Sequence, residues 1–399
     1  MNEAAEIVRR HLNDDVHALA AQSHWFEPFD KMMLLRQIQS RQKAKSKLPS
    51  WYGNFDLLFP VPLSVEQCSS ELAADYKAGL VCGNLLVDMT GGMGVDSSAF
   101  ARRMRKVIFI ERQEELAKIS EHNFKALKIN NIEVVCGDST TQIEKWEKPD
   151  WIFLDPARRK EGRKVFLLED CEPDVLQLLP HLWAAGTQNV LLKLSPLFDI
   201  TQLKRDLPGI HTVHIVAVHN EVKELLAEVQ PQAAAGLQIV CVNLESGAEP
   251  EKWCCNTCSN GVENRAIEKI VPESFSMPGY LYEPHATVMK SGMMDAYAQQ
   301  FDLCKLQKNS HLYYSEKLVE NFFGRIFKIE SVFGMGKAEL KQGLSGLTKA
   351  NITTRNFPLK EADLRKKLKL ADGGEVTLVA TTLQNNRHVI FRCAAAFKC

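Results

Sequence analysis

The hydrophobic pattern at the start of the chain is helical. Apolar positions recur every three or four residues at Ile7, Val8, Leu12, Val16 and Leu19 and again within Met32–Ile38, which is typical of the buried face of an amphipathic helix. Farther on, Ser64-Val65-Glu66-Gln67 fits a capping box, so we predict a helix from there to about Ala78. Residues 1–80 are therefore predicted to form an N-terminal helical domain.

The pattern changes at Leu85, where short continuous apolar runs begin to alternate with helical segments. Seven runs are predicted as strands: Leu85–Met89, Val107–Glu111, Ile132–Cys136, Trp151–Leu154, Asn189–Leu194, Val213–Val218 and Leu237–Leu244. Apolar strands alternating with helices indicate a parallel sheet that is buried on both faces. The link Asn220–Gly236 contains Gln230-Pro231-Gln232, so we predict that the last two runs form an antiparallel hairpin at one edge. The fold class is α/β, with a mostly parallel seven-stranded sheet over residues 81–246.

The last third of the chain is predicted to be small and mixed. Residues 247–328 begin with an irregular linker, and residues 329–399 have the pattern of an α+β unit. There, Lys360–Leu370 is a basic helix, while Val376–Thr382 and His388–Cys393 alternate as a hairpin does. Four domains are thus expected: 1–80, 81–246, 247–328 and 329–399.

Composition narrows the class of protein. Lys plus Arg and Asp plus Glu both number 49, which excludes a globally basic nucleic-acid coat but permits a local basic patch. No apolar run approaches the length of about 18 residues that a membrane helix needs. The acidic start is wrong for a secretory signal, and the 11 scattered cysteines form no disulfide framework. We expect a cytoplasmic protein without a membrane segment.

The strongest chemical feature is the glycine-rich turn Val87–Asp96, which lies between a predicted strand and a predicted helix. Gly92 and Gly94 would let the backbone approach a ligand where a Cβ atom would collide. A dinucleotide site needs a third glycine where Ser97 stands, and Asp96 would repel its phosphates. These two residues disfavour a nicotinamide-dependent oxidoreductase. Asp88 and the glycines instead favour S-adenosylmethionine, which has no phosphate and carries a cationic amino group.

Further carboxylates end the next predicted strands. Glu111 ends the second strand and can accept both ribose hydroxyls, and Asp138 follows the third and can accept from the adenine amino group. Open α/β sheets bind their ligands at these carboxyl ends. We therefore assign S-adenosylmethionine binding to one group of residues: Asp88, Thr90, Gly91, Gly92, Gly94, Glu111 and Asp138.

The predicted chemical site is Asp155-Pro156, after the fourth strand. A carboxylate beside a proline-stiffened carbonyl supplies two acceptors for one exocyclic amine. Arg158 and Arg159 open a basic run that could meet phosphates of a polynucleotide. Lys193 lies at the end of the fifth strand, where it lines the cleft or extends from the sheet. We assign Asp155, Pro156 and Arg158 to catalysis, and Arg158, Arg159 and Lys193 to substrate binding.

A zinc site is the alternative role for the cysteines of the linker. Cys255 and Cys258 are spaced as zinc ligands often are, with Cys254 beside them, but no second pair follows. Buried or free thiols are the favoured interpretation, and no metal is expected.

Several runs of the chain resemble one bacterial family of class I methyltransferases. They are VDMTGGMGVD, the strand-ending Glu111, CGDS at 136–139, DPARRKEGRKV at 155–165, KLSP at 193–196 and TTRNFP at 353–358. The resemblance covers almost the whole chain. It implies a Rossmann-like catalytic domain that uses S-adenosylmethionine, followed by ferredoxin-like and THUMP-like domains. It also implies RNA as a partner, because THUMP modules elsewhere grip tRNA.

The motif after the fourth strand departs from known target-base motifs. Amino-group methyltransferases usually carry an aromatic residue that stacks on the flipped base, but Ala157-Arg158 stands there. The motif also has no cysteine to attack a base covalently. We expect direct methyl transfer to a base nitrogen of structured RNA, tRNA or rRNA. The alternatives are a small-molecule or protein methyltransferase and a non-catalytic RNA-binding protein with a Rossmann scaffold.

Overall fold

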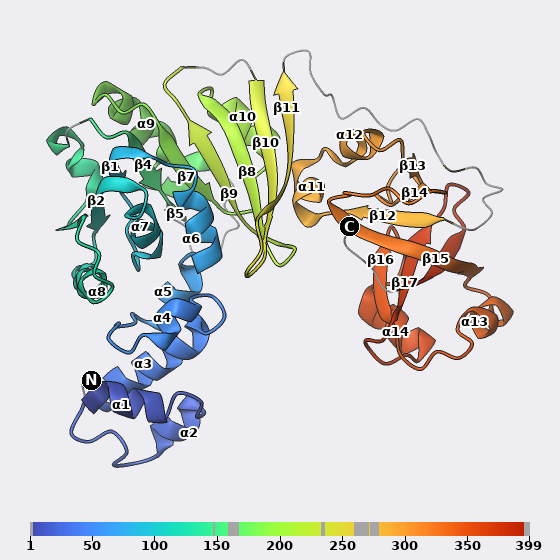
Figure 1. The fold of residues 1–399 in the computed structure, drawn as a ribbon, viewed down its shortest axis with the longest axis horizontal. Coiled ribbons are helices and arrows are strands. Elements are labelled where there is room, and N and C mark those ends of the chain that lie inside the picture. Colours follow the sequence, from blue (N-terminus) through green and yellow to red (C-terminus); the bar gives the residue numbers. More distant parts are fainter. Residues whose placement is uncertain are drawn as a thin grey trace. The chain divides into compact units, whose positions relative to one another are not determined.

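The computed structural model describes residues 3–146, 148–158, 167–232, 236–258, 271 and 279–394. The chain divides into two compact units, and Figure 1 shows the elements of both. The first unit comprises Met1–Val218, Lys223–Leu237 and Leu244–Glu249, and the second comprises His219–Val222, Gln238–Asn243 and Pro250–Cys399. The predicted division into four domains stays a prediction.

The first unit begins with six helices, as the periodicity predicts. They are α1 (Glu3–Arg10), α2 (Val16–Ala21), α3 (Lys31–Ala44), α4 (Pro49–Gly53), α5 (Pro62–Gln67) and α6 (Glu71–Ala78). The single helix predicted from Ser64 to Ala78 is wrong, because Ser70 accepts a hydrogen bond from the Ala73 backbone N–H at 3.2 Å and starts a separate helix. Leu34 and Ile38 of α3 are fully buried in the core of this region.

Among the described residues, nine strands form a mixed sheet, and most of them belong to the first unit. Its strands are β1 (Gly83–Asp88), β2 (Met104–Glu111), β3 (Ile132–Cys136), β4 (Trp151–Leu154), β7 (Val190–Leu194), β8 (Ile210–Val218), β9 (Glu221–Val229), β10 (Gly236–Leu244) and β11 (Glu251–Cys258). Their order is β11-β10-β8-β9-β7-β4-β1-β2-β3. β3, β2, β1, β4 and β7 pair in parallel, whereas β9 pairs antiparallel to β7. The sheet is α/β as predicted, but it has nine mixed strands instead of seven mostly parallel ones.

The difference arises in two segments. The irregular linker predicted from residue 247 is wrong, because it contains the strand β11, and the other segment is the predicted link between the last two runs. The link Asn220–Gly236 contains the strand β9, so β8 continues directly into β9 through His219 and Asn220. Both residues have positive φ, 52° and 60°, as a tight hairpin turn requires. The sequence pattern did not predict β9 because four of its residues are charged, although the run Glu224–Ala227 at its centre is buried.

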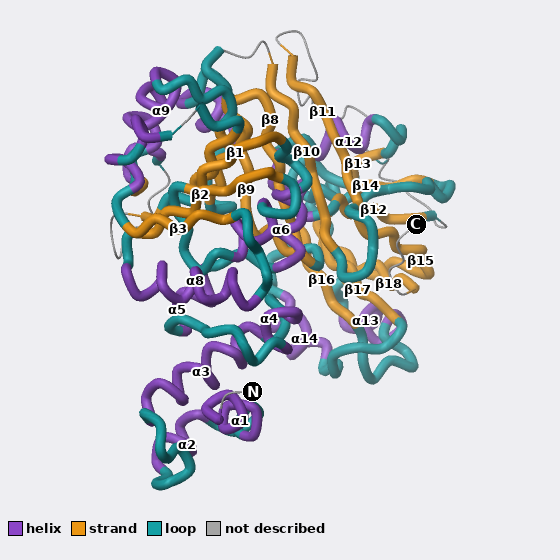
Figure 2. Tube along the Cα trace, turned by 60° about the vertical axis from the view of Figure 1, so that its left-hand side comes forward, coloured by secondary structure: helices purple, strands orange, loops and turns teal. Residues whose placement is uncertain are grey.

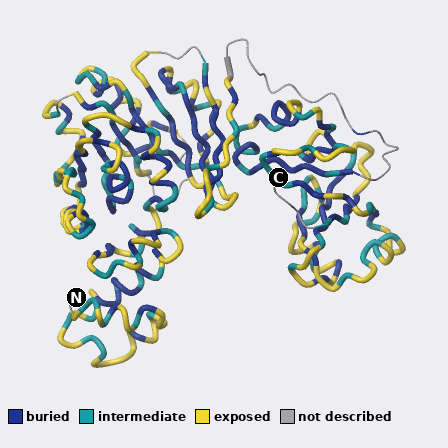
Figure 3. Tube along the Cα trace, viewed as in Figure 1, coloured by how far each residue is buried: buried dark blue, intermediate teal, exposed yellow. Residues whose placement is uncertain are grey.

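Helices and short turns connect the parallel strands. They are α7 (Val95–Phe100), α8 (Glu114–Ala126), η1 (Ser139–Thr141), η2 (Ile143–Lys145), η3 (Leu168–Asp170), α9 (Val175–Ala184) and α10 (Ile200–Asp206), with the small hairpin β5 (Ala157–Arg158) and β6 (Cys171–Glu172). The central strands are dark, that is buried, in Figure 3, and Figure 2 shows the alternation of strand and helix around them. Because β1 to β4 are parallel, the residues that follow them lie at one edge of the sheet.

The second unit contains its own sheet. Its further elements are β12 (Tyr280–Pro284), α11 (Ala286–Ser291), α12 (Met294–Gln299), β13 (Cys304–Lys305), β14 (Tyr313–Ser315), β15 (Gly324–Gly334), α13 (Lys337–Gly343), β16 (Asn351–Arg355), α14 (Glu361–Leu368), β17 (Val376–Thr382) and β18 (His388–Ala394). Seven of them form a sheet in the order β13-β14-β12-β15-β18-β17-β16. β15 pairs with β12 through Gly324–Lys328 and with β18 from Ile329 onward, so it runs through the predicted boundary at 328/329.

None of the helices within the described ranges is both long enough and apolar enough to cross a bilayer.

Candidate active site

The glycine-rich turn between β1 and α7 is shaped by its own neighbours. Gly92 and Gly94 have φ values of 59° and 80°, in the left-handed region that favours glycine. A Cβ atom on Gly94 would lie 2.6 Å from the Phe124 ring, and one on Gly91 would lie 2.4 Å from the Phe109 ring. At Gly91 and Gly94 a Cβ atom would therefore collide with buried aromatic rings of the protein itself. These rings fix the path of the turn.

Glu111 ties the turn to the end of β2. Its two carboxylate oxygens accept from the backbone N–H groups of Gly92 at 2.9 Å and Gln113 at 2.8 Å. The residue is only 8% exposed, yet it lines the same cavity as the turn. Each oxygen of a carboxylate can accept a second bond, so Glu111 retains acceptor capacity toward the cavity.

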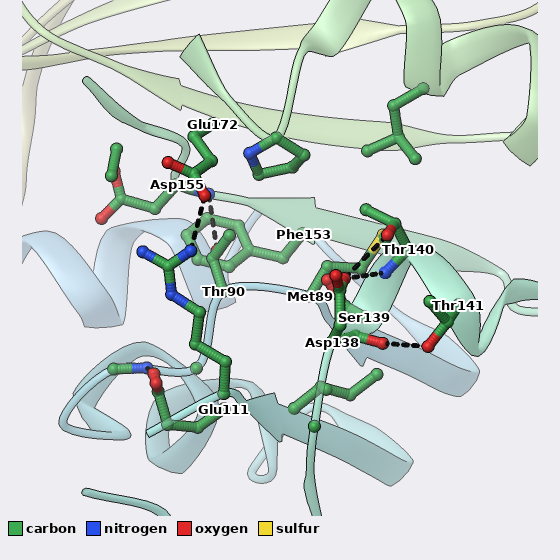
Figure 4. Close-up of a pocket in the computed structure, with 18 of the residues that line it drawn as sticks. Met89, Thr90, Glu111, Asp138, Ser139, Thr140, Thr141, Phe153, Asp155 and Glu172 are labelled. Carbon is green, nitrogen blue, oxygen red and sulfur yellow. Dashed lines mark hydrogen bonds and ion pairs between the residues drawn. The ribbon is translucent and has the colours of Figure 1, made fainter. Parts of the chain in front are cut away.

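Asp138 lies beyond β3 and is exposed. One of its oxygens accepts from the backbone N–H and the hydroxyl of Thr140, at 2.9 and 2.7 Å. These bonds cap η1 and fix the carboxylate beside Ser139 at the cavity wall. Figure 4 shows Asp138, Ser139, Thr140 and Thr141 grouped on one side of the cavity and Asp155 on the other.

Asp155 follows β4 and is held at two points. Its backbone N–H donates to the Thr90 hydroxyl at 2.7 Å, and its carboxylate forms an ion pair with Lys193. Burial alone would lower the pKa of Lys193, but the carboxylates of Asp155, Asp96 and Glu224 together raise it above its ordinary value. Lys193 is therefore a permanent cation, and it fixes the orientation of the Asp155 carboxylate.

Asp88 lies beneath the turn and is fully buried. It accepts from the Ser97 hydroxyl at 2.6 Å and from the Thr90 backbone N–H at 3.0 Å. Burial raises the pKa of Asp88 to about 7, against the lowering effect of these hydrogen bonds, and the nearby charges of Asp96 and Asp155 add to the rise. In this structure Asp88 holds Thr90, and through Thr90 it supports Asp155.

A buried charge network joins α6 to this part of the sheet. Lys77 is fully buried and contacts Glu224 at 2.7 Å and Asp96 at 3.2 Å, while its ammonium donates to the Ser69 hydroxyl at 2.9 Å. Ser69 in turn donates to Asp96 at 2.8 Å. Burial would raise the pKa of Asp96, but the charges of Lys77 and Lys193 outweigh it and lower that pKa. Asp96 stays ionised where it faces the cavity.

The glycine-rich turn and the carboxylates of Asp96, Glu111, Asp138 and Asp155 line a cavity of about 1110 Å³. Of the residues assigned from sequence, the cavity brings together Thr90, Gly91, Gly92, Gly94, Glu111, Asp138 and Asp155. Asp88, Pro156 and Lys193 are described but do not line it. Arg159 falls outside the described residues, and so does the side chain of Arg158, whose backbone is in β5.

The cysteines of the linker lie on β11. Cys254 is exposed and Cys255 is buried, as expected for neighbours that point to opposite faces of a strand. The side chain of Cys258 lies outside the described part of the chain. Among the residues that the structure describes, no group of three or more His, Cys, Asp or Glu side chains could hold a metal ion.

The sequence pattern does not predict every residue of the cavity wall. Ser64, Gln67 and Cys68 of the helical region line it, as do Arg112 and Glu172, which pair at 2.6 Å. Arg112 directly follows Glu111, so the rule that ligands bind at strand ends could have found it. The residues around α5 carry no comparable signal, because only tertiary packing brings them to the cavity.

The cavity fits S-adenosylmethionine. Its volume suffices for a ligand of that size, and Glu111 offers fixed carboxylate oxygens to hydroxyl groups. Asp96 and Asp155 line it as well, which suits a ligand with a positively charged sulfur and an ammonium group.

Comparisons with known proteins agree with this chemistry. Three family signatures match: Conserved hypothetical protein 95 over residues 74–171, a ferredoxin-like domain over 280–322 and a THUMP domain-like region over 324–395. Two S-adenosylmethionine-dependent methyltransferases of Mycobacterium tuberculosis, from strains CDC 1551 and H37Rv, are each 21% identical over 322 residues, or 80% of this chain and 83% of theirs.

A solved structure extends the similarity to nearly the whole chain. The crystal structure of a proposed methyltransferase from Porphyromonas gingivalis W83 is 32% identical and covers 98% of this chain and 97% of its own, with a TM-score of 0.84. At that identity and coverage the relationship is one of family and not of fold alone. The chain belongs to the family of S-adenosylmethionine-dependent methyltransferases that carry ferredoxin-like and THUMP-like domains.

Proposed function

We propose that this methyltransferase acts on structured RNA, tRNA or rRNA, and transfers the methyl group directly to a base nitrogen. The observation that carries the proposal is the setting of Asp155. Thr90 and Lys193 fix this residue at the cavity wall, and among the described residues no group bonds to its Oδ1 oxygen. A positioned carboxylate oxygen suits an N–H group whose nitrogen becomes positively charged as it reacts.

Each residue of the site has a separate role in the proposed methyl transfer. Glu111, Asp138 and the glycine-rich turn hold S-adenosylmethionine, which when bound supplies a methyl group on a positively charged sulfur. Transfer of the methyl group to the base nitrogen would leave S-adenosylhomocysteine as the second product. Asp155 Oδ1 would take the proton that the nitrogen loses and pass it to water. The ion pair with Lys193 holds the Asp155 carboxylate in place. Pro156 stiffens the adjoining carbonyl as a second acceptor, and Arg158 and Arg159 meet phosphate.

RNA is supported by the second unit and by charge. The THUMP domain-like match covers residues 324–395, and THUMP modules elsewhere grip tRNA. The run Arg158–Lys164 holds five basic residues next to Asp155 in sequence, which suits phosphate contact. Direct transfer is supported by the absence of a cysteine from the segment 155–165.

The test is methyl transfer from labelled S-adenosylmethionine to total RNA from cells that lack the protein. We expect the label in one nucleoside, methylated on a base nitrogen, when the digested RNA is analysed by mass spectrometry. Label only in protein or in small molecules would refute the RNA substrate. Label on carbon 5 of a pyrimidine would refute transfer to nitrogen.

A further inference from the structure

Three charged residues of the second unit form a cluster far from the cavity in sequence. Glu283 of β12 is buried, with 5% of its side chain exposed. Arg325 of β15 donates to its Oε2 oxygen through Nε at 2.6 Å, and Nε of Arg355, at the end of β16, lies 2.6 Å from its Oε1 oxygen. Two guanidinium groups thus share one carboxylate.

The cluster has more positive charge than the buried carboxylate requires. One arginine would neutralise Glu283, so two arginines leave one net positive charge. Both arginines are partly exposed, 38% for Arg325 and 39% for Arg355. Within the described residues, Nη1 of Arg325 and Nη2 of Arg355 have no hydrogen-bond partner. Each therefore has N–H donors left for a ligand.

The two guanidinium groups are also held in place. The Arg325 guanidinium lies 5.4 Å from the ring centre of the buried Phe327, and Arg355 Nη1 donates to the Thr354 carbonyl at 3.1 Å. Asn356, the next residue, donates to Gln307 at 3.0 Å. Side chains that are already ordered lose little entropy when a ligand binds.

Other arginine–glutamate pairs of the same unit differ. Arg387 pairs with Glu339 at 2.9 Å, and both side chains are exposed, 59% and 45%. That is one cation for one anion at the surface, which leaves no net charge. The two-to-one arrangement around Glu283 therefore needs a reason beyond surface pairing.

We propose that Arg325 and Arg355 form a phosphate-binding site for the RNA backbone. A guanidinium group matches the oxygens of a phosphodiester with two parallel N–H donors, and Glu283 orients both groups while leaving their outer donors free. The site would hold the RNA through its backbone, so it adds affinity without reading sequence. This inference rests on the proposed RNA substrate.

The test is binding of labelled total tRNA and rRNA fragments to the full chain across a salt series. The variants are Arg325→Ala and Arg355→Ala, each of which leaves Glu283 paired with one arginine. The matched control is Arg387→Ala. Thermal unfolding and S-adenosylmethionine affinity are measured for each variant. We expect either arginine variant to weaken RNA binding several-fold and to lower the salt slope by about 0.9 per lost phosphate contact. The control should change neither.

The outcomes separate this site from the proposed function. If the wild type binds and methylates RNA while both variants keep its affinity and slope, the phosphate site is wrong and the RNA substrate stands. If both variants unfold at clearly lower temperature but bind RNA as the wild type does, the cluster only stabilises the sheet. If the wild type binds no RNA at any salt concentration, both proposals fail.

Discussion

At the scale of single residues, Glu111 offers the sharpest test of the cofactor site. Its carboxylate is fixed by two backbone N–H groups and lines the cavity. We expect Glu111→Ala to weaken S-adenosylmethionine binding by about 2 kcal/mol, the scale of hydrogen bonds to a charged acceptor. Calorimetry measures it, with Glu114→Ala on the exposed start of α8 as the control. An unchanged affinity would remove Glu111 from the site.

Substitutions of Asp155 and Lys193 are expected to lower the rate of methyl transfer more than the affinity for S-adenosylmethionine. Asp155→Asn keeps the shape of the side chain but loses its charge, so turnover should fall by roughly 10²-fold or more, with S-adenosylmethionine affinity within a few-fold of wild type. Lys193→Met should lower turnover too, because the orientation of Asp155 is lost. Single-turnover transfer to RNA measures both. Equal turnover in Asp155→Asn and wild type would show that Asp155 is only structural.

Asp88 predicts a pH dependence of stability. Because burial raises its pKa from 3.8 to about 7, the folded chain keeps a proton that the unfolded chain has released between these values. Its contribution to the free energy of unfolding therefore falls as the pH rises from about 4 to about 7, and is constant above that. Asp88→Asn should remove this slope, so the variant should gain stability relative to wild type across that window. Denaturant unfolding at several pH values measures the difference, and parallel curves would contradict it.

At the scale of elements, the contact between α6 and the sheet depends on Lys77. Removing it leaves the buried carboxylates of Asp96 and Glu224 without the cation that contacts them, which typically costs about 3–5 kcal/mol. We expect that loss in Lys77→Met. Lys43→Met breaks the exposed pair with Glu66 and should cost less than about 1 kcal/mol. Denaturant unfolding compares the two, and similar losses would mean that the buried network adds nothing.

The elements also show what the sequence can predict. The strands β1 and β2 match their apolar runs closely, because their carboxyl-terminal halves are buried and a strand buried on both faces must be apolar. The strand β3 also matches its run, although its residues are only half-buried or exposed. The strand β9 was missed, since its charged residues follow no simple alternation. The carboxylates of Glu111, Asp138 and Asp155, which line the cavity, could be singled out from the sequence because each ends or follows a strand. The wall formed by Gln67 and Cys68 could not be, because it depends on how helices pack.

At the scale of the whole molecule, the cavity residues all belong to the first unit and the phosphate site to the second. A core defect in the second unit should therefore leave the cofactor site intact. Phe391 is fully buried in that unit, and Phe391→Ala should cost about 3–5 kcal/mol. We expect one unfolding transition to move to lower temperature in calorimetry while S-adenosylmethionine affinity stays within a few-fold. Loss of cofactor binding below that transition would show that the units are coupled.

The strand β15 has a consequence for how such proteins can evolve. The ferredoxin-like match ends at residue 322 and the THUMP domain-like match begins at 324, which suggests two parts that could be exchanged freely. Yet β15 pairs with β12 at its start and β18 at its end, and one core contains Leu281, Phe327 and Phe391. A recombination event at that junction would leave each fragment with an unpaired strand edge and an open core. Descendants of this chain are therefore expected to keep or lose both parts together.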